Sequence, residues 1–362
     1  MLRNVKVLDL TRVLAGPLCT MMLGDLGADV LKIERPDGGD ETRGWGPPFD
    51  EAGESAYYLS VNRNKLGISI DLDNSADRAL LERLLADADV VVDNFRPGVL
   101  ARRGLDADAV RAKHPAIVWC IISGFADEPN RPGYDFVVQA ESGWMSITGE
   151  PAGAPMKHGI ALADVLAGKD AAIAILAALV DRARSGVGAT VTITLAGSAA
   201  ATLVNVAQNA LVSGAAPRRW GNAHANLVPY ELFEASDRAI VIAAGSDVQW
   251  LACARALDLA AMAEDETLHT NAGRLTHRAR VVGAIRAKVK ERTAAEWRVR
   301  LDAAGVPNGV VRTVPEVLAE SDASARTGMP PSVPGTVRLA PPRLGEHTAA
   351  VREHGWGAFH RR

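Results

Sequence analysis

Cysteine is scarce in this chain of 362 residues. Cys19, Cys120 and Cys253 lie far apart in apolar stretches and form no CxxC pair. An odd number of dispersed cysteines gives no disulfide framework and no CxxC redox site. We therefore expect three buried thiols in a protein of the reducing cytoplasm.

Long hydrophobic runs and an excess of one charge are also missing. The longest apolar run, 171–180, is too short to cross a bilayer, and the N-terminus lacks the apolar core of a signal peptide. The net charge is −3, so the chain has no surplus of Lys and Arg for nucleic-acid phosphates. These absences predict a cytoplasmic protein that binds neither membrane nor nucleic acid.

Several catalytic signatures are absent as well. The chain has no HExxH, no Cys/His cluster at metal-ligand spacing and no GxSxG, which argues against a zinc protease and an α/β-hydrolase. The turn "TRVLAGP" after the first apolar run holds only Gly16, where a dinucleotide fingerprint needs three glycines. We therefore expect no metal and neither NAD nor FAD.

What the chain does have is a regular alternation of strand and helix patterns. Such alternation predicts an α/β fold with an open, Rossmann-like parallel sheet, whose ligands bind beyond the carboxyl ends of the strands. Helical stretches separate five short apolar runs that are typical of buried strands: 5–10, 28–34, 65–72, 89–95 and 116–125.

The length of the chain favours two domains. We expect a large domain over 1–198 that is completed by the C-terminal segment 325–362. Residues 199–220 are expected to form a linker helix and loop, and 221–324 a smaller α/β domain. Helices are also predicted over 99–105 and 199–212.

One carboxylate stands out in this pattern. Asp164 heads the small, apolar stretch "ALADVLAGKDAAIAILAAL", which predicts a buried helix over 164–184. Burying a charge is costly unless something compensates. Asp164 is therefore either the N-cap of this helix or a group used in chemistry. Small residues on both sides leave space above the carboxylate, which favours chemistry.

Charged and polar side chains gather near the predicted strand ends. A single arginine there could be a solvated loop charge, but several together suit phosphate oxygens. The basic residues are Arg12, Arg35, Lys65, Arg96 and Arg102. Upstream of Asp164, the polar residues Tyr134, Asp135 and Gln139 are embedded in apolar surroundings.

Several blocks of the sequence resemble the class III CoA-transferases, the CaiB/BaiF family. They include "VLDLTRVLAGPLCTMMLGDLGADVLKIERP", "VVVDNFRPGVLARRGL", "RPGYDFVVQAESGWMSITGE" and "ALADVLAGKDAAIAILAAL". The resemblance implies a sheet domain that binds CoA rather than NAD, and a smaller second domain. It also implies an interlaced homodimer, in which each chain forms a ring threaded by the other. CoA or acyl-CoA would be a substrate, with no permanently bound cofactor.

Residue roles are implied by the same resemblance. Asp164 falls on the family's catalytic aspartate. The chain has Leu14 where some members have Gln, and it lacks a glycine run after Arg219, which disfavours a formate or oxalate enzyme. The implied CoA contacts are Val13, Leu14, Ala15, Arg35, Ile70, Asp71, Leu72, Asp73, Asn94, Phe95, Arg96 and Arg102, with Tyr134 and Asp135 near the pantetheine.

The implied reaction transfers CoA from a donor acyl-CoA to an acceptor carboxylic acid, through an aspartyl anhydride and an aspartyl–CoA thioester. We expect the helix start to keep Asp164 ionised. Backbone N–H groups at that helix start and in the loop near Gly221 are expected to stabilise oxyanions. The acid pocket is expected to be built from the second domain and the 144–149 loop, where Trp144 and Trp220 are either walls of an aromatic pocket or plain packing residues. Dicarboxylates such as succinate are the expected donors by analogy.

Two alternatives remain open. The α-methylacyl-CoA racemases share the fold, but they pair the aspartate with a histidine at the position of Tyr134, and tyrosine is a poor base near neutral pH. The other alternative is a CoA-binding protein without catalysis.

Overall fold

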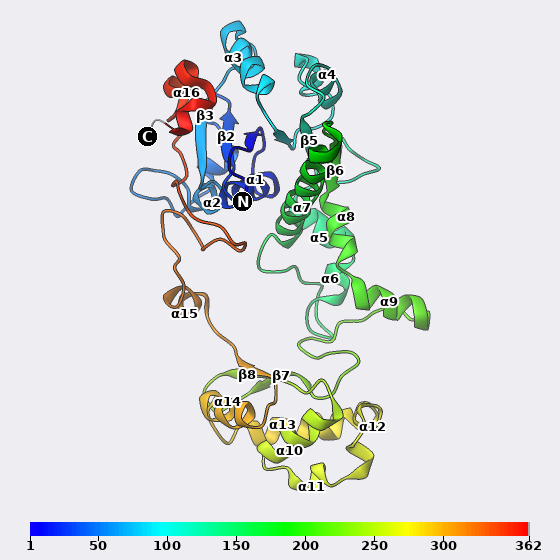
Figure 1. Cartoon of the computed structure of the whole chain (residues 1–362). Coiled ribbons are helices and arrows are strands. Elements are labelled where there is room, and N and C mark those ends of the chain that lie inside the picture. The colour runs from blue at the N-terminus through cyan, green and yellow to red at the C-terminus, as the bar shows by residue number, and fades with distance from the viewer. Residues whose placement is uncertain (361–362) are drawn as a thin grey trace. The chain divides into compact units, whose positions relative to one another are not determined.

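A computed structural model of the chain describes residues 1–360 (Figure 1). The chain forms two compact units. The first comprises Met1–Met145, Lys157–Ala215 and residues 321–360; the second comprises Ser146–Met156 and Ala216–Glu320. Relative to the domain bounds expected from the sequence, residues 199–215 group with the first unit and 146–156 with the second.

The first unit is built on a six-stranded parallel sheet with the order β3-β2-β1-β4-β5-β6. This is the Rossmann order, so the predicted α/β fold class is confirmed. The strand order reverses between β1 and β4, where a crevice forms beyond the carboxyl ends of the strands. The strands are β1 (Lys6–Asp9), β2 (Asp29–Glu34), β3 (Lys65–Ser69), β4 (Val90–Asp93), β5 (Val118–Ser123) and β6 (Thr190–Thr194).

Helices cover both faces of this sheet. The helical segments in this part of the chain, including those that do not touch the sheet, are α1 (Ala15–Asp25), η1 (Glu41–Gly44), α2 (Ala56–Ser60), α3 (Ser75–Ala86), η2 (Ala101–Arg103), α4 (Ala107–Lys113), α5 (Asp135–Glu141), α6 (Trp144–Ile147), α7 (Leu162–Ser185), α8 (Leu195–Ala201), α9 (Val204–Ser213), α16 (Thr348–His354) and η4 (Gly355–His360).

Alternating side chains along the strands divide the core into two layers. On one face, residues such as Leu8 and Val91 pack with α3 and the C-terminal Trp356. On the other face, their neighbours Val7 and Val90 pack with α1 and α7. The helices α1 and α7 approach closely because a Cβ at Gly168 would lie 2.6 Å from the carbonyl oxygen of Ala15.

Two helix predictions were wrong. The helix expected over 99–105 is only the short η2, because Gly98 and Gly104 on either side adopt positive φ angles of 79° and 68°. The helix expected over 199–212 is broken into α8 and α9, which meet at a bend of 65°. The Thr202 hydroxyl at the break donates to the carbonyl oxygen of Ala199 (2.7 Å). Within residues 1–360, no single helix is long and apolar enough to cross a bilayer, although α8 and α9 together meet that criterion as a bent pair.

The second unit has a three-stranded antiparallel sheet in the order β7-β8-β9, packed with helices around Trp250 and Trp297. The strands are β7 (Tyr230–Glu234), β8 (Ala239–Ala243) and β9 (Asn308–Val310). The helices are α10 (Asp247–Ala256), α11 (Ala260–Ala263), η3 (Glu266–Leu268), α12 (Asn271–Thr276), α13 (Arg278–Val289), α14 (Ala294–Ala303) and α15 (Val314–Ala319). Arg219 fixes the 146–156 segment to this unit by donating to the carbonyl oxygens of Glu150 (3.1 Å) and Gly153 (2.7 Å).

Candidate active site

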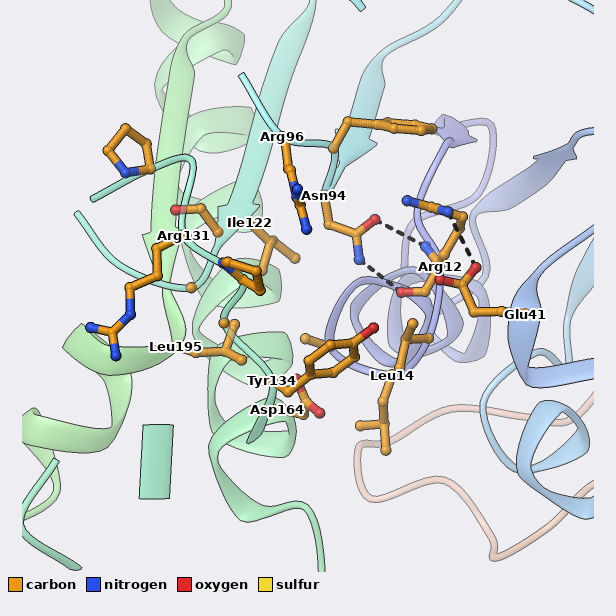
Figure 2. A pocket seen from close by; sticks show the side chains of 18 residues that line it. Arg12, Leu14, Glu41, Asn94, Arg96, Ile122, Arg131, Tyr134, Asp164 and Leu195 are labelled. Atoms are coloured by element: carbon orange, nitrogen blue, oxygen red, sulfur yellow. Dashed lines mark hydrogen bonds and ion pairs between the residues drawn. The ribbon is translucent and has the colours of Figure 1, made fainter. Parts of the chain in front are cut away.

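A cavity of about 190 Å³ lies in the first unit, at the carboxyl ends of β1, β4 and β5 (Figure 2). It occupies the reversal in strand order, where doubly wound sheets bind their ligands. Four chain segments contribute the predicted site residues that line it: Val13, Leu14 and Ala15; Asn94, Phe95 and Arg96; Tyr134; and Asp164.

Asp164 lies in the first turn of α7, with its carboxylate directed toward this cavity and next to Tyr134 (Figure 2). Asp164 is not the N-cap of the helix, because that position belongs to Ala161. Within residues 1–360, no hydrogen bond or ion pair reaches the Asp164 carboxylate. The structure therefore leaves this partly buried carboxylate available for chemistry.

The cap of α7 comes instead from Asp135 on α5. One Asp135 carboxylate oxygen accepts a hydrogen bond from the backbone N–H of Ala163 (2.8 Å). The other accepts one from the side-chain amide of the fully buried Gln139 (2.7 Å). Both oxygens of Asp135 are thus engaged in holding the start of the helix that carries Asp164.

The expectation that the helix start keeps Asp164 ionised was wrong. Burial raises the pKa of Asp164, and the neighbouring Asp135 charge raises it further, to about 7. The favourable effect of a helix N-terminus, about 0.3–1 kcal/mol, does not offset this loss of hydration. Asp164 is therefore divided between its acid and its carboxylate near neutral pH.

Tyr57 on α2 belongs to the electrostatic environment of Asp164, and the sequence analysis did not select it. Burial, followed by the charges of Asp164, Asp135 and Asp40, raises the pKa of the Tyr57 phenol to about 12. Its ring packs edge-on against Trp45, with ring centroids 5.1 Å apart. The phenol therefore remains a hydrogen-bond donor. No spacing rule marks a tyrosine that tertiary folding brings near a carboxylate.

Three arginines line the cavity, and they differ in their partners. Arg131 is paired with two glutamates, and Arg12 lies 3.3 Å from Glu41 with its guanidinium over the Phe95 ring. Arg96 has no side-chain hydrogen bond or ion pair to any residue in 1–360, and it points into the cavity (Figure 2). Arg96 is thus a free cation for an anionic ligand.

A close backbone contact seats the loop that carries Tyr134. A Cβ at Gly124 would lie 2.4 Å from the Cα of Gly133, and a Cβ at Gly133 would lie 2.2 Å from the Cα of Gly124. Only two glycines allow the loop to rest on the end of β5 at this distance. The contact brings Tyr134 to the cavity wall beside Asp164.

A second cavity of about 340 Å³ lies beyond the ends of β2 and β3. Arg12 and Phe95 line both cavities, so the two adjoin. The predicted contacts Arg35, Ile70, Asp71, Leu72 and Asp73 line this second cavity. Arg102 lines neither cavity; its neighbour Arg103 lines the second and pairs with Asp73 (3.3 Å).

The tryptophans expected in an acid pocket have other surroundings. Trp144 is buried in the first unit, and its indole N–H donates to the Thr202 hydroxyl (3.0 Å), as a packing residue would. The guanidinium groups of Arg218 and Arg278 lie over the ring of Trp220 in the second unit, 3.9 and 4.9 Å from its centroid.

Two further features concern the expected chemistry. The N–H of Gly221 already donates to the carbonyl oxygen of Gly149 (3.2 Å), which removes it as a free oxyanion donor. All three cysteines are buried, and burial raises the pKa of the Cys120 and Cys253 thiols to about 12. In the described part of the chain, no cluster of three or more His, Cys, Asp or Glu could hold a metal ion.

The chain matches the sequence model of CoA-transferase family III over residues 2–348. It belongs to this family. The CoA-transferase is 38% identical to the succinate–glutarate CoA-transferase of Agrobacterium fabrum over 377 residues, which cover 97% of this chain and 94% of that protein. It is also 38% identical to the succinyl-CoA:glutarate CoA-transferase of Mus musculus, over 97% of this chain and 85% of that protein.

A solved structure shows the same fold. The crystal structure of a CaiB/BaiF family protein from Brucella suis superposes with a TM-score of 0.86 at 37% identity, covering 97% of this chain and 98% of that one. The resemblance found in the sequence blocks is thereby confirmed. As a family III CoA-transferase, the enzyme transfers CoA between an acyl-CoA and a carboxylic acid, and its two adjoining cavities suit a long thioester substrate.

Proposed function

We propose that this CoA-transferase uses Asp164 as its nucleophile and exchanges CoA between dicarboxylic acids. The observation that carries the proposal is the Asp164 carboxylate itself. It faces a cavity at the reversal in strand order, it has no hydrogen-bond partner within residues 1–360, and its pKa is raised to about 7. A carboxylate with a raised pKa is less stabilised by its surroundings and is a better nucleophile.

The donor half of the reaction begins when a carboxylate oxygen of Asp164 attacks the thioester carbonyl of the acyl-CoA. The carbon–sulfur bond breaks, which leaves an aspartyl mixed anhydride and CoA thiolate. The thiolate then attacks the aspartyl carbonyl, and the carbon–oxygen bond to the donor acyl group breaks. The donor leaves as a free carboxylate, and CoA remains bound to Asp164 as a thioester.

The acceptor half reverses these steps. The carboxylate of the incoming acid attacks the aspartyl thioester carbonyl and expels CoA thiolate, which gives a second mixed anhydride. The thiolate attacks the acyl carbon of the acceptor, and the Asp164 carboxylate is released unchanged. No net proton or electron transfer occurs over the whole cycle.

The turn before α1 supplies donors for the tetrahedral intermediates. The backbone N–H groups of Leu14, Ala15 and Gly16 have no acceptor within residues 1–360, and the first two of these residues line the cavity with Asp164. Oriented N–H groups at the start of a helix stabilise an oxyanion without needing to reorganise. This assignment replaces the expected donor at Gly221.

The two cavities divide the CoA molecule in this proposal. The nucleotide end occupies the second cavity, beside Arg35 and the 70–73 turn. The pantetheine arm passes Phe95, which lines both cavities, and brings the thioester to Asp164. Arg102, which lines neither cavity, is the least supported of the implied contacts.

Dicarboxylic acids are the proposed substrates for two reasons. The relatives from Agrobacterium fabrum and Mus musculus carry succinate and glutarate in their names. The unpaired Arg96 guanidinium in the cavity provides a positive charge that a second carboxylate group would require.

We also propose a homodimer in the cytoplasm. Helix α9 buries none of its residues, and it exposes Val204, Leu211 and Val212 by 69–79%. Such an amphipathic helix gains stability by packing against another surface, here a second copy of the chain. Unpaired cysteines fit a reducing compartment. Light scattering of the purified protein tests the dimer, and a monomer at micromolar concentration contradicts it.

Intact-mass spectrometry tests the reaction. The protein is mixed with succinyl-CoA, glutaryl-CoA and butyryl-CoA in turn, with Asp164→Asn as the control. We expect a hydroxylamine-sensitive adduct on the wild-type chain only, with the mass of CoA less one water, formed with the dicarboxylic donors. An adduct on both chains, or α-proton exchange with solvent deuterium without any adduct, would contradict transfer through Asp164.

A further inference from the structure

The turn that leads into α1 contains a residue in an unfavourable backbone conformation. Val13 has a φ of 72°, in the left-handed region. A β-branched side chain rarely adopts this conformation, and the surrounding structure has to enforce it. Because Arg12, Val13, Leu14 and Ala15 all line the cavity with Asp164, the shape of this turn bears directly on the reaction.

Side chains from two other segments hold the turn. The ammonium group of Lys32 on β2 donates to the carbonyl oxygen of Thr11 (3.0 Å). The Asn94 amide after β4 accepts from the N–H of Arg12 (3.0 Å) and donates to its carbonyl oxygen (2.7 Å), as Figure 2 shows. These bonds leave the Asn94 amide little capacity for CoA, so its implied contact would have to come from the backbone.

Asp40 completes the set at the strained residue itself. Each of its carboxylate oxygens lies 3.3 Å from the backbone nitrogen of Val13, which donates to them. Asp40 is held in turn by Lys32 (3.0 Å) and by the N–H and hydroxyl of Thr42 (3.1 and 2.8 Å). The side chains of Asp40 and Lys32 are fully buried, so water does not compete for these bonds.

We infer that Asp40, Lys32 and Asn94, called the clamp below, are positioning residues of the transfer reaction. They bond four consecutive backbone groups, from the Thr11 carbonyl to the Val13 N–H, and so impose the left-handed conformation on Val13. This conformation directs the free N–H groups of Leu14 and Ala15 toward the reacting carbonyl. The inference rests on the proposed function, because it takes the carbonyl to be the one that forms at Asp164.

The main test removes the buried ion pair without leaving an unpaired charge. The double variant Asp40→Leu with Lys32→Met replaces it by apolar side chains of similar size, an exchange that folded proteins often tolerate. The matched control is Asp25→Leu with Arg63→Met, which removes another buried ion pair of the same unit (2.6 Å), at the far end of α1.

We expect the Asp40/Lys32 variant to lose roughly 30-fold or more in kcat, because a displacement of about 1 Å costs about 100-fold in rate. The KM for the acyl-CoA should change less than kcat, and circular dichroism should show both variants folded. The Asp25/Arg63 control should stay within about threefold of wild type. Equal losses in the two variants would overturn the inference and assign Asp40 a role in stability alone.

A second test relieves the strain instead of removing the clamp. Glycine adopts the left-handed region as readily as the right-handed one, so Val13→Gly should reduce the need for Asp40. The loss of kcat caused by Asp40→Asn should be at least about fivefold smaller in the Val13→Gly background than in the Val13 background. The same loss in both backgrounds would overturn the inference.

A crystal structure of the Asp40/Lys32 double variant separates this inference from the proposed function. If the wild-type enzyme formed no adduct with any donor, the proposed function would fail. The φ of Val13 in the variant would still show whether Asp40 and Lys32 hold the turn. A φ that moves to negative values supports the clamp. A φ that remains left-handed without Asp40 overturns it.

Discussion

Asp9 and Asp164 are both carboxylates largely removed from water in the same unit, yet they have opposite surroundings. Asp9, at the end of β1, lies 2.9 Å from the buried Lys65 and accepts hydrogen bonds from Thr11 and Thr20. Burial alone would raise its pKa, but the charges of Lys65 and Lys32 and the hydrogen bonds from Thr11 and Lys65 lower the pKa to about 2. Within residues 1–360, no cation pairs with Asp164, and its pKa is raised to about 7.

Under the proposed function, this difference separates a structural carboxylate, Asp9, from a reactive one, Asp164. A buried charge that is fully paired fixes the backbone around it but has no free lone pair for a substrate. A buried carboxylate without partners is costly to the fold, and such perturbed groups concentrate at functional sites. Substitutions of both carboxylates and the pH dependence of the enzyme test this contrast.

The largest effect is expected for Asp164→Asn. The amide has the same shape but cannot form the anhydride, so kcat should fall on the order of 10³-fold or more, while the affinity for CoA stays within about threefold. Steady-state kinetics with succinyl-CoA and calorimetric titration with CoA measure these two quantities. A variant whose kcat stays within tenfold of the wild-type value would show that Asp164 is not the nucleophile.

Asp9→Asn should cause the largest loss of stability. Removing one partner of a buried ion pair leaves the Lys65 charge uncompensated, which costs about 3–5 kcal/mol of unfolding free energy. Urea denaturation followed by circular dichroism measures it. As the control, Asp73→Asn breaks a pair whose carboxylate is 75% exposed and should change stability by less than about 0.5 kcal/mol.

The activity should depend on pH through the ionisation of Asp164. Only the carboxylate attacks the thioester, so kcat/KM should rise about tenfold per pH unit below the pKa of about 7 and level off above it. Initial rates between pH 5 and 9 measure the profile. A flat profile across pH 6–8 would show that the pKa of Asp164 is not raised in the working enzyme.

The same pKa predicts a smaller effect on stability. The pKa of Asp164 in the folded state, about 7, lies above the value of about 3.9 for an unfolded chain. Between pH 4 and pH 7 the unfolded chain has lost the Asp164 proton while the folded chain still holds it, so the free energy of unfolding falls as the pH rises. This loss of stability is complete above pH 7 and absent below pH 4. Asp164→Asn should be about 1–3 kcal/mol more stable than wild type at pH 8 and equal to it at pH 4. A wild type that is the more stable at pH 8 would contradict this.

The smallest effect is expected for Asp135→Asn. An asparagine oxygen can still accept from the Ala163 N–H, so α7 keeps its cap, while the bond from the Gln139 amide is lost. The charge of Asp135 that raises the pKa of Asp164 is gone. The rising limb of kcat/KM should move to lower pH with the plateau little changed. An unmoved limb would leave burial as the whole cause of the raised pKa.

The sheet and the proposed nucleophile were predictable from the sequence because local patterns indicate them. The apolar runs predicted the strands to within a few residues. The acidic residue at the start of an apolar helix indicated Asp164 as a candidate without knowledge of the fold. The resemblance supplied the CoA contacts, and all of them except Arg102 and Asp135 line one of the two cavities.

The parts that were missed depend on tertiary contacts. No pattern in the sequence shows that Asp135 caps a helix 28 residues further along the chain, or that Tyr57 lies in the field of Asp164. The expectation that the helix start keeps Asp164 ionised was wrong for the same reason. Helix position can be read from the sequence, but desolvation and the approach of a second carboxylate cannot.

The close packing at Gly168 determines how near α7 lies to α1 at the candidate active site. Gly168 lies one helical turn beyond Asp164, and it touches the carbonyl of Ala15, the residue that begins α1 beside the Val13 turn. The absence of a side chain at Gly168 therefore sets the distance between the proposed nucleophile on α7 and the proposed backbone donors at the start of α1. A larger side chain at Gly168 would move α7 away from α1 and widen the gap between Asp164 and these N–H groups, without changing the identity of any group in the site.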